Sequence, residues 1–233
     1  MRRVRGVLWR GRSKINGEPI AVVATEGNAK LGAMVQLWIV PLTGDVIQTR
    51  RESDTGTIKS VCGDCPMGTA SYVLPLGPQV IVKALQDGNY PDIPFAALKG
   101  RKVRIGAWGD PGAVPGKVWS QVKAEALGTT SYTHRHRAVS LKAVSMASCE
   151  SLEQAARMEA RGWRTYTVLP AGAPMPEGRV LCPASKEAGE RTTCADCLLC
   201  DGKRGANDAR RNVVVYAHGT SARILSNKLS MVV

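Results

Sequence analysis

Five residues that could bind a metal lie close together near the end of the chain. Cys194, Cys197 and Cys200 are each separated by two residues, which places three thiols within one tight turn. Cys182 and His218 flank them. Soft sulfur donors at this spacing suit Zn²⁺ or an iron–sulfur cluster. Because the Gly, Asp, Asn and Lys residues around them can bury little apolar area, we expect metal–ligand bonds to order this segment.

A second pair of thiols, Cys62 and Cys65, has the same two-residue spacing and precedes a proline. The pair could supply half of a four-ligand site completed by Cys149 or Cys182, bind a separate metal, or form a redox dithiol. Structural disulfides or scattered buried thiols are the alternative for the late cysteines. An odd total of seven cysteines, gathered in such motifs, fits a reducing cytoplasm better than a secreted scaffold. We therefore favour metal binding and expect a cytoplasmic protein.

Acid–base side chains follow or end three of the predicted strands. Asp110 lies in a Gly-Asp-Pro sequence just past an apolar run, where a carboxylate could act as general base, nucleophile or substrate acceptor. A turn-forming Asp before Pro is the alternative. His134 and His136 would point to the same side of an extended segment and could together bind a metal. Glu150 is a further candidate, and the adjacent Cys149 is either reactive or a small buried residue.

The chain is strongly basic, with a formal net charge of +13 and an isoelectric point near 9.7. Such an excess favours a polyanionic partner, usually nucleic acid, although a solubilising surface is the alternative. We expect DNA, in preference to RNA, as that partner. The basic residues gather in three groups: Arg2, Arg3, Arg5, Arg10 and Arg12 at the start, Arg135 and Arg137 in the middle, and Lys203, Arg204, Arg210 and Arg211 late.

The first hundred residues predict a β-rich region. Residues 1–17 form a basic arm with a short strand over residues 4–9, and the apolar runs 20–24 and 34–40, separated by glycines, predict a hairpin. A short helix is expected over residues 79–86. The basic start has no apolar signal-peptide core, and no apolar run approaches the ~20 residues of a membrane span. We therefore expect no membrane partner.

From residue 101 onward strands and helices alternate. We expect strands at 103–107, 130–136, 143–146, 163–169, 180–181 and 212–216, with helices at 117–126 and after a capping Ser151 up to Gly162. Such units predict one α/β domain over residues 1–233 with a parallel sheet, either open or closed into a (β/α) barrel-like or partial barrel. Because chemistry gathers at the carboxyl ends of such strands, most candidate side chains should meet on one face.

Six short motifs occur in order along the chain: GNAKLG at 27–32, CGDCP at 62–66, GDP at 109–111, MAS at 146–148, GWR at 162–164 and the tail CPAS…CADCLLCDG…AHG. Together they resemble an uncharacterised family of small phage-encoded, cysteine-rich proteins. The resemblance covers nearly the whole chain from residue 27. The family pattern has a third cysteine where this chain has Ser71.

The late cysteines and His218 also resemble the zinc site of the guanine transglycosylases, which are (β/α) barrels that exchange a base in tRNA or phage DNA. Their spacing differs from that family's CxCxxC. This resemblance implies structural zinc, a small modified base such as a 7-deazaguanine as substrate, and a role for Asp110 in handling that substrate. His134, His136 and Glu150 are further catalytic candidates because of their positions at the ends of predicted strands. Arginines and lysines would neutralise the phosphates. The leading hypothesis is therefore a base-modifying transferase that acts on nucleic acid.

Two alternatives remain open. The spacing of Cys62, Cys65 and the Gly-Asp-Pro turn resembles the layout of radical SAM enzymes, which implies an iron–sulfur cluster and S-adenosylmethionine, although this chain lacks their CxxxCxxC motif. The other alternative is a non-enzymatic protein that is held together by zinc and binds DNA or RNA.

Overall fold

The computed structural model describes residues 3–28, 31–44 and 76–218, together with residues 223, 226, 227 and 229. The predicted metal ligands Cys62 and Cys65, and also Ser71, lie outside the described residues.

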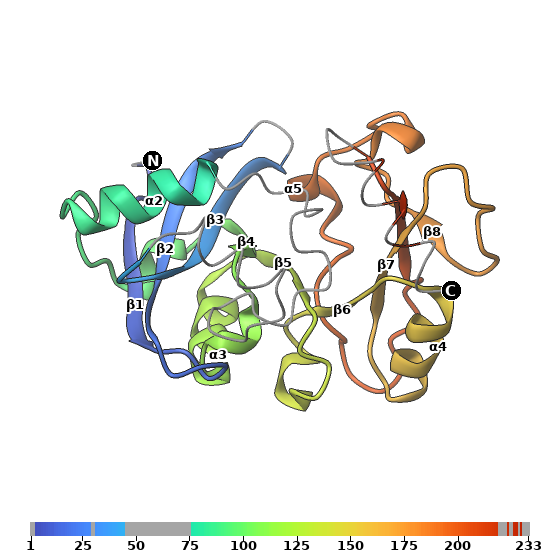
Figure 1. Cartoon of the computed structure of the whole chain (residues 1–233), viewed down its shortest axis with the longest axis horizontal. Helices are drawn as coiled ribbons and strands as arrows, with labels where there is room; N and C mark the ends of the chain where they lie inside the picture. The colour runs from blue at the N-terminus through green and yellow to red at the C-terminus, as the bar shows by residue number, and fades with distance from the viewer. Residues whose placement is uncertain are drawn as a thin grey trace.

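The described strands form one mixed sheet in the order β1-β2-β3-β4-β5-β6-β7-β9-β8 (Figure 1). Strands β1 to β3 pair antiparallel and every later pair is parallel. Among the described residues the sheet is open, with β1 and β8 at its edges. The strands are β1 (Gly6–Arg12), β2 (Pro19–Asn28), β3 (Gly32–Pro41), β4 (Lys102–Trp108), β5 (Gly128–Thr133), β6 (Met146–Cys149), β7 (Thr165–Leu169), β8 (Val180–Leu181) and β9 (Val213–Tyr216).

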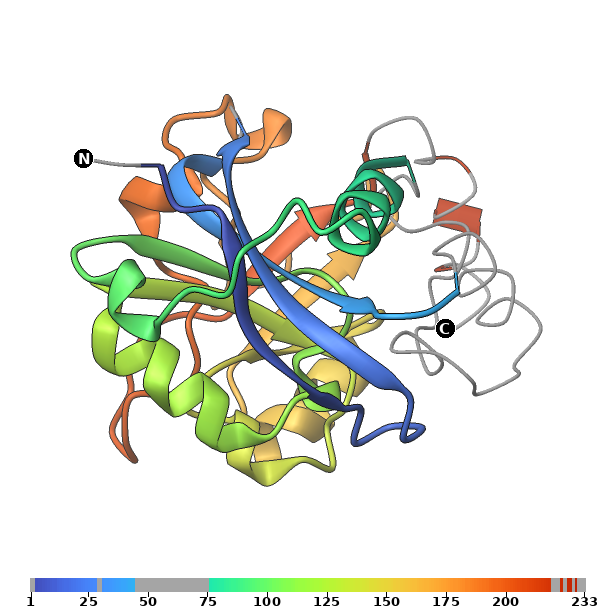
Figure 2. The same cartoon turned by 90° about the vertical axis from the view of Figure 1, so that its left-hand side faces the viewer.

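Helices cover both faces of this sheet. Figure 2 shows α2 (Leu76–Gln86) on one side, and α3 (Gly116–Glu125) and α4 (Leu152–Ala160) on the other. The predicted cap is confirmed, because the Ser151 hydroxyl accepts the Gln154 N–H at the start of α4. The remaining helical segments are short: η3 (Phe95–Leu98), η4 (Pro111–Ala113), η5 (Val139–Leu141), η6 (Lys186–Ala188) and α5 (Cys194–Cys197). Among the described residues, no helix is both long enough and apolar enough to cross a lipid bilayer.

Burial on both faces explains the continuous apolar run of β2. Ile20 and Val22 belong to the core on the α3 side, which includes the fully buried Trp119. Ala21 and Val23 belong to the core beneath α2. Successive side chains of a strand point to opposite faces, so a strand that is covered on both sides reads as uninterrupted apolar sequence.

The strand expected at residues 143–146 begins three residues later than predicted. Residues 139–141 form the 3-10 helix η5, and the Ser145 N–H donates to the Leu141 carbonyl, which prevents strand pairing there. Strand β6 begins at Met146, opposite Tyr132 of β5. Val144 is nevertheless buried, so its apolar character reflects core packing without indicating the type of element.

The cysteine-rich segment packs on the same face as α2. Ala195 of α5 contacts Leu31 and Met34 at the start of β3. Its continuation is held by the buried guanidinium of Arg164, whose Nη1 donates to the carbonyls of Leu199 (2.7 Å) and Asp201 (3.1 Å). Nη2 of the same side chain donates to the Arg211 carbonyl (2.8 Å). One side chain at the start of β7 therefore fastens two loops to the sheet.

Replacing this guanidinium should destabilise the fold. Arg164→Met leaves three carbonyls without their donor and removes one of the three cations that pair with the Asp201 carboxylate, and we expect a loss of about 3 kcal/mol in the free energy of unfolding. Urea denaturation followed by circular dichroism measures it. The matched control is Arg161→Met on the exposed end of α4, which should change stability by less than about 0.5 kcal/mol. Equal stability of both variants and the wild type would contradict this role.

Candidate active site

Asp110 joins the loop after β4 to the end of β5. Its Oδ1 accepts hydrogen bonds from the Gly112 N–H (2.7 Å) and the Thr133 hydroxyl (2.7 Å). Its Oδ2 accepts the backbone N–H of His134 (2.8 Å). The carboxylate therefore caps η4 and at the same time fixes the backbone from which the His134 side chain extends.

His134 is paired with Glu150, which follows the neighbouring strand β6. The distance from His134 Nε2 to Glu150 Oε1 is 2.7 Å, and Glu150 is only 4% exposed. Because a carboxylate accepts, we assign the proton to Nε2, which leaves Nδ1 with a lone pair that can take up a proton. The Glu150 backbone N–H donates to Gln154 Oε1 (2.8 Å), so α4 helps to hold the carboxylate in place.

This pairing raises the pKa of His134 above its ordinary value of 6.5. Burial of the ring opposes the charged form, but the hydrogen bond that His134 donates to Glu150 and the negative charges of Glu150 and Asp110 outweigh burial. The environment thus stabilises an imidazolium at position 134. A histidine held in this way by a carboxylate is suited to accept a proton and return it.

His136 has a different environment. Its Nε2–H donates to the Ser148 carbonyl (2.8 Å), and its ring meets Trp163 edge-on at 6.3 Å between centroids. Burial and the neighbouring His134 lower its pKa, so His136 is neutral at pH 7. The two imidazole centroids are 6.4 Å apart and each ring has its own partner, which does not favour a shared metal.

Cys149 lies in the core beside α4, and burial raises its pKa to about 12. A thiol in that state is a poor nucleophile. The alternative of a small buried residue therefore fits Cys149 better than a reactive role. The sequence reading missed Thr133, whose hydroxyl links Asp110 to the end of β5. Its position at a strand end, just before the two histidines, was the available signal.

The late cysteines gather on the α2 face of the sheet. Cys182 and Cys200 pack in one apolar cluster, and the strongest charge interactions of the Cys200 thiol are with Cys182, Cys194 and Cys197. Burial is the main cause that raises the pKa of Cys200 to about 12. As placed in the described part of the chain, no three Cys, His, Asp or Glu side chains converge closely enough to hold a metal ion. The cysteine thiols are therefore ligands of the type that a thiophilic metal prefers. As placed in the structure, however, they lie too far apart to coordinate one ion together.

His218, the other predicted ligand, follows β9. Its Nδ1 donates to the Tyr216 carbonyl (2.8 Å) and lies 4.0 Å from the Glu187 carboxylate. It is not among the groups that most affect the pKa of Cys200. Of the side chains expected to meet at the carboxyl ends of the strands, Asp110, His134 and Glu150 are joined by hydrogen bonds. His218 is not part of this series and lies near the Glu187 carboxylate on η6.

Two of the three basic groups lie at opposite ends of the parallel strands. Arg135 and Arg137 follow β5, at the carboxyl ends of the strands and beside the His134–Glu150 pair. The later group precedes β9, at the amino end. There the Arg210 guanidinium pairs with Asp201 and Asp208, and Arg204 Nε donates to Asp201. Lys203 and Arg211 of that group lie in the same loop.

Pairing changes what these charges can do. Hydrogen bonds from Arg210 lower the pKa of Asp208 well below its usual range, and the same contacts raise the pKa of Arg210. The charge of Arg210 is therefore largely used within the protein. Of the two groups, Arg135 and Arg137 lie nearer to the His134–Glu150 pair along the chain.

Comparison with known proteins gives no relative for this chain, because no family model, curated protein or solved structure matches it.

The His134–Glu150 pair should make stability depend on pH. Since the pKa of His134 is raised in the folded state, its contribution is complete below the unfolded value of 6.5 and is lost as the pH rises through the folded pKa. Wild type should therefore exceed Glu150→Gln in unfolding free energy by about 1–2 kcal/mol at pH 6, and by less at pH 9. Denaturant titrations at the two pH values measure this difference.

Glu153→Gln is the control for this experiment, because Glu153 lies on the exposed side of α4 and pairs with Arg157. It should follow the wild-type pH profile. His136 is present in all three proteins, so the comparison isolates His134. If the unfolding free energy of Glu150→Gln changed with pH in parallel with that of the wild type, the His134–Glu150 pair would not stabilise an imidazolium.

Proposed function

We propose that this protein is an enzyme that performs acid–base chemistry on nucleic acid, with modification of a base as its reaction. The proposal is supported chiefly by one observation. Asp110, His134 and Glu150 form a hydrogen-bonded series across the carboxyl ends of β4, β5 and β6. In parallel α/β sheets this edge is where catalytic side chains collect.

In this proposal His134 is the general base and acid. Glu150 holds Nε2–H in place and stabilises the imidazolium that forms when Nδ1 takes a proton from water or from a substrate N–H or O–H. Asp110 is a positioning residue, because both carboxylate oxygens already accept hydrogen bonds from the protein. The neutral His136 supplies a second imidazole near that of His134, with 6.4 Å between the ring centroids.

Nucleic acid is the proposed substrate because of charge. The net charge is +13, and Arg135 and Arg137 lie within three residues of His134. Arginine binds phosphate through paired N–H donors, so these two side chains suit a phosphate backbone that passes the site. Exchange of guanine for a small modified base is the most specific form of the reaction.

Replacing the proposed general base, His134, should abolish the modification of nucleic acid while leaving the affinity for nucleic acid unchanged. DNA and RNA from cells that express the protein, supplied with a 7-deazaguanine precursor, would be digested and their nucleosides quantified by mass spectrometry. We expect a new nucleoside with the wild type, and a 10²–10⁴-fold lower yield with His134→Ala. Glu150→Gln should behave similarly, whereas Glu153→Gln should match the wild type.

Affinity for a labelled duplex, measured in parallel, should be unchanged in His134→Ala. Nucleoside profiles identical to those of cells without the protein would contradict the proposed reaction. An undiminished yield of the modified nucleoside with His134→Ala would contradict the assignment of His134 as general base.

We also propose that the late cysteines bind zinc, with Cys182 joining Cys194, Cys197 and Cys200. The proposal rests on the common neighbourhood of these four thiols, which would have to move closer together to coordinate an ion. His218 remains the alternative fourth ligand, and the iron–sulfur reading with S-adenosylmethionine is the alternative for the metal. When bound, zinc would order the segment and take no part in the acid–base step.

Metal content tests this assignment. Mass spectrometry on anaerobically purified protein should find about one zinc per chain, and Cys197→Ser should lose it because one thiolate ligand is removed. Cys149→Ser is the control and should keep the metal, since Cys149 lies in the core beside α4. Brown protein with iron and labile sulfide would favour the radical SAM alternative. Protein without either metal would contradict the proposed site.

One observation favours a non-enzymatic nucleic-acid-binding protein. The Asp110 carboxylate is fully used in internal hydrogen bonds, as it would be in a purely structural turn. The two functions differ in the nucleoside analysis described above, because a binding protein would leave every base unchanged.

A further inference from the structure

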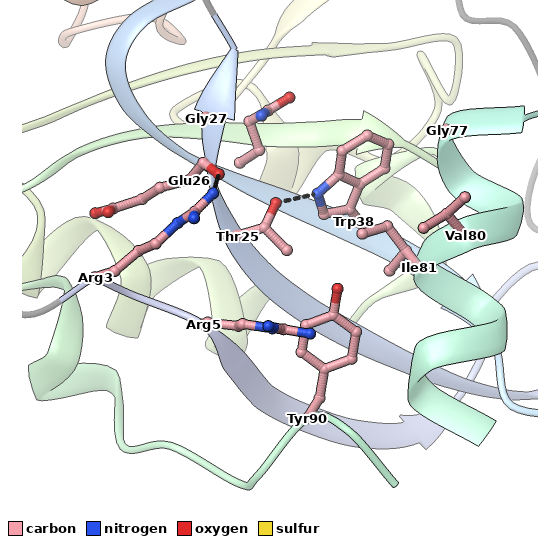
Figure 3. A pocket seen from close by; sticks show the side chains of 11 residues that line it. Arg3, Arg5, Thr25, Glu26, Gly27, Trp38, Gly77, Val80, Ile81 and Tyr90 are labelled. Atoms are coloured by element: carbon pink, nitrogen blue, oxygen red, sulfur yellow. Dashed lines mark hydrogen bonds between the residues drawn. The ribbon is translucent and has the colours of Figure 1, made fainter. Parts of the chain in front are cut away.

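A pocket of about 400 Å³ lies between α2 and the strands β2 and β3, beside the segment that leads into β1 and apart from the acid–base site (Figure 3). Its volume falls within the range of small-molecule sites. Arginines and aromatic rings line it together with an apolar wall from α2. The residues that define its chemistry are Arg3, Arg5, Thr25, Trp38, Val80 and Tyr90.

The two arginines give the pocket a positive charge. Arg3 Nη2 donates to the Glu26 carbonyl (2.7 Å), and the Arg5 guanidinium lies over the Tyr90 ring at 5.0 Å from its centroid. The Glu26 carboxylate, which also lines the pocket, pairs with Arg101 at 3.0 Å, so its charge is already balanced in part by that arginine. A guanidinium stacked on a ring uses its face and keeps its N–H edge for an anion.

The aromatic side of the pocket is held in a fixed orientation. The indole Nε1 of Trp38 donates to the Thr25 hydroxyl (2.8 Å), so the polar edge of the ring is already used. Figure 3 shows Trp38 and Tyr90 between the arginines and the helix that bears Val80. Val80 is 66% exposed, an unusual position for a large apolar side chain on a helix that packs against a sheet.

We propose that this pocket binds a nucleotide unit, with its phosphate on Arg3 and Arg5 and its base against Trp38 and Val80. A phosphate satisfies the guanidinium N–H groups, and a planar base suits an aromatic surface whose polar edge is occupied. The unit is either a free mononucleotide or one nucleotide of a strand. The site involves other strands than the His134–Glu150 pair, so it is independent of the proposed reaction.

Isothermal titration calorimetry of the full chain tests this site. The probes are AMP, adenosine, inorganic phosphate and a single-stranded oligodeoxynucleotide of twelve residues. AMP or the oligonucleotide should bind more tightly than adenosine or phosphate alone, because only they present base and phosphate together. Binding of AMP identifies a free mononucleotide, and binding of the oligonucleotide alone identifies a strand; both results support the site.

Variants locate the binding. Arg5→Ala and Arg3→Ala should each weaken the nucleotide probe about tenfold or more, and Trp38→Leu should weaken it with no effect on phosphate. Arg12→Ala removes the same charge from β1 outside the pocket, where Arg12 contacts the Gly17 carbonyl, and should have little effect. Circular dichroism would verify that each variant is folded.

Two results would overturn the proposal. One is the failure of both AMP and the oligonucleotide to bind more tightly than adenosine and phosphate. The other is an equal loss in Arg12→Ala and Arg5→Ala, which would reduce the effect to overall charge. Neither result bears on His134, whose activity test uses a different substrate and different variants.

Discussion

Three hydrogen bonds to one carboxylate, that of Asp110, join the loop after β4 to the end of β5. Because the carboxylate accepts the backbone N–H of His134, it sets where that side chain begins. The parallel register of β5 and β6 then places Glu150 within hydrogen-bonding distance of the imidazole. The proposed acid–base pair therefore depends on a carboxylate whose two oxygens both accept hydrogen bonds from the protein. The same constraint explains why a turn-forming aspartate and a functional one are difficult to distinguish by sequence.

Local sequence patterns predicted the elements of the fold correctly where the pattern of apolar residues matched their burial. The glycine-separated apolar runs gave the hairpin of β2 and β3, and the serine–glutamine spacing gave the start of α4. The strand near residue 145 was misplaced because buried apolar residues occur equally well in a tight 3-10 turn. Whether the strands close into a barrel depends on tertiary register and twist, which no short pattern encodes; the described strands form an open sheet.

The candidate site was predictable in its members and less so in its pairing. The rule that strand ends collect functional groups selected Asp110, His134 and Glu150 correctly as neighbours, because the strands are parallel. Sequence spacing suggested that His134 would act with His136, yet the register directs each ring to a different partner. Charge counting likewise treated Arg210 as free to bind phosphate, although loop geometry pairs it with acidic residues. Such pairings depend on contacts between distant segments.

The most direct test of the acid–base pair is an NMR pH titration of the imidazole rings. The chain contains only three histidines, so each ring signal can be assigned by single substitution. The structure predicts that His134 titrates above 6.5 and His136 below it. Glu150→Gln should lower the pKa of His134, because the carboxylate that stabilises the imidazolium is then removed. A His134 ring that titrates at or below 6.5 in the wild type, and is unchanged in Glu150→Gln, would contradict the account.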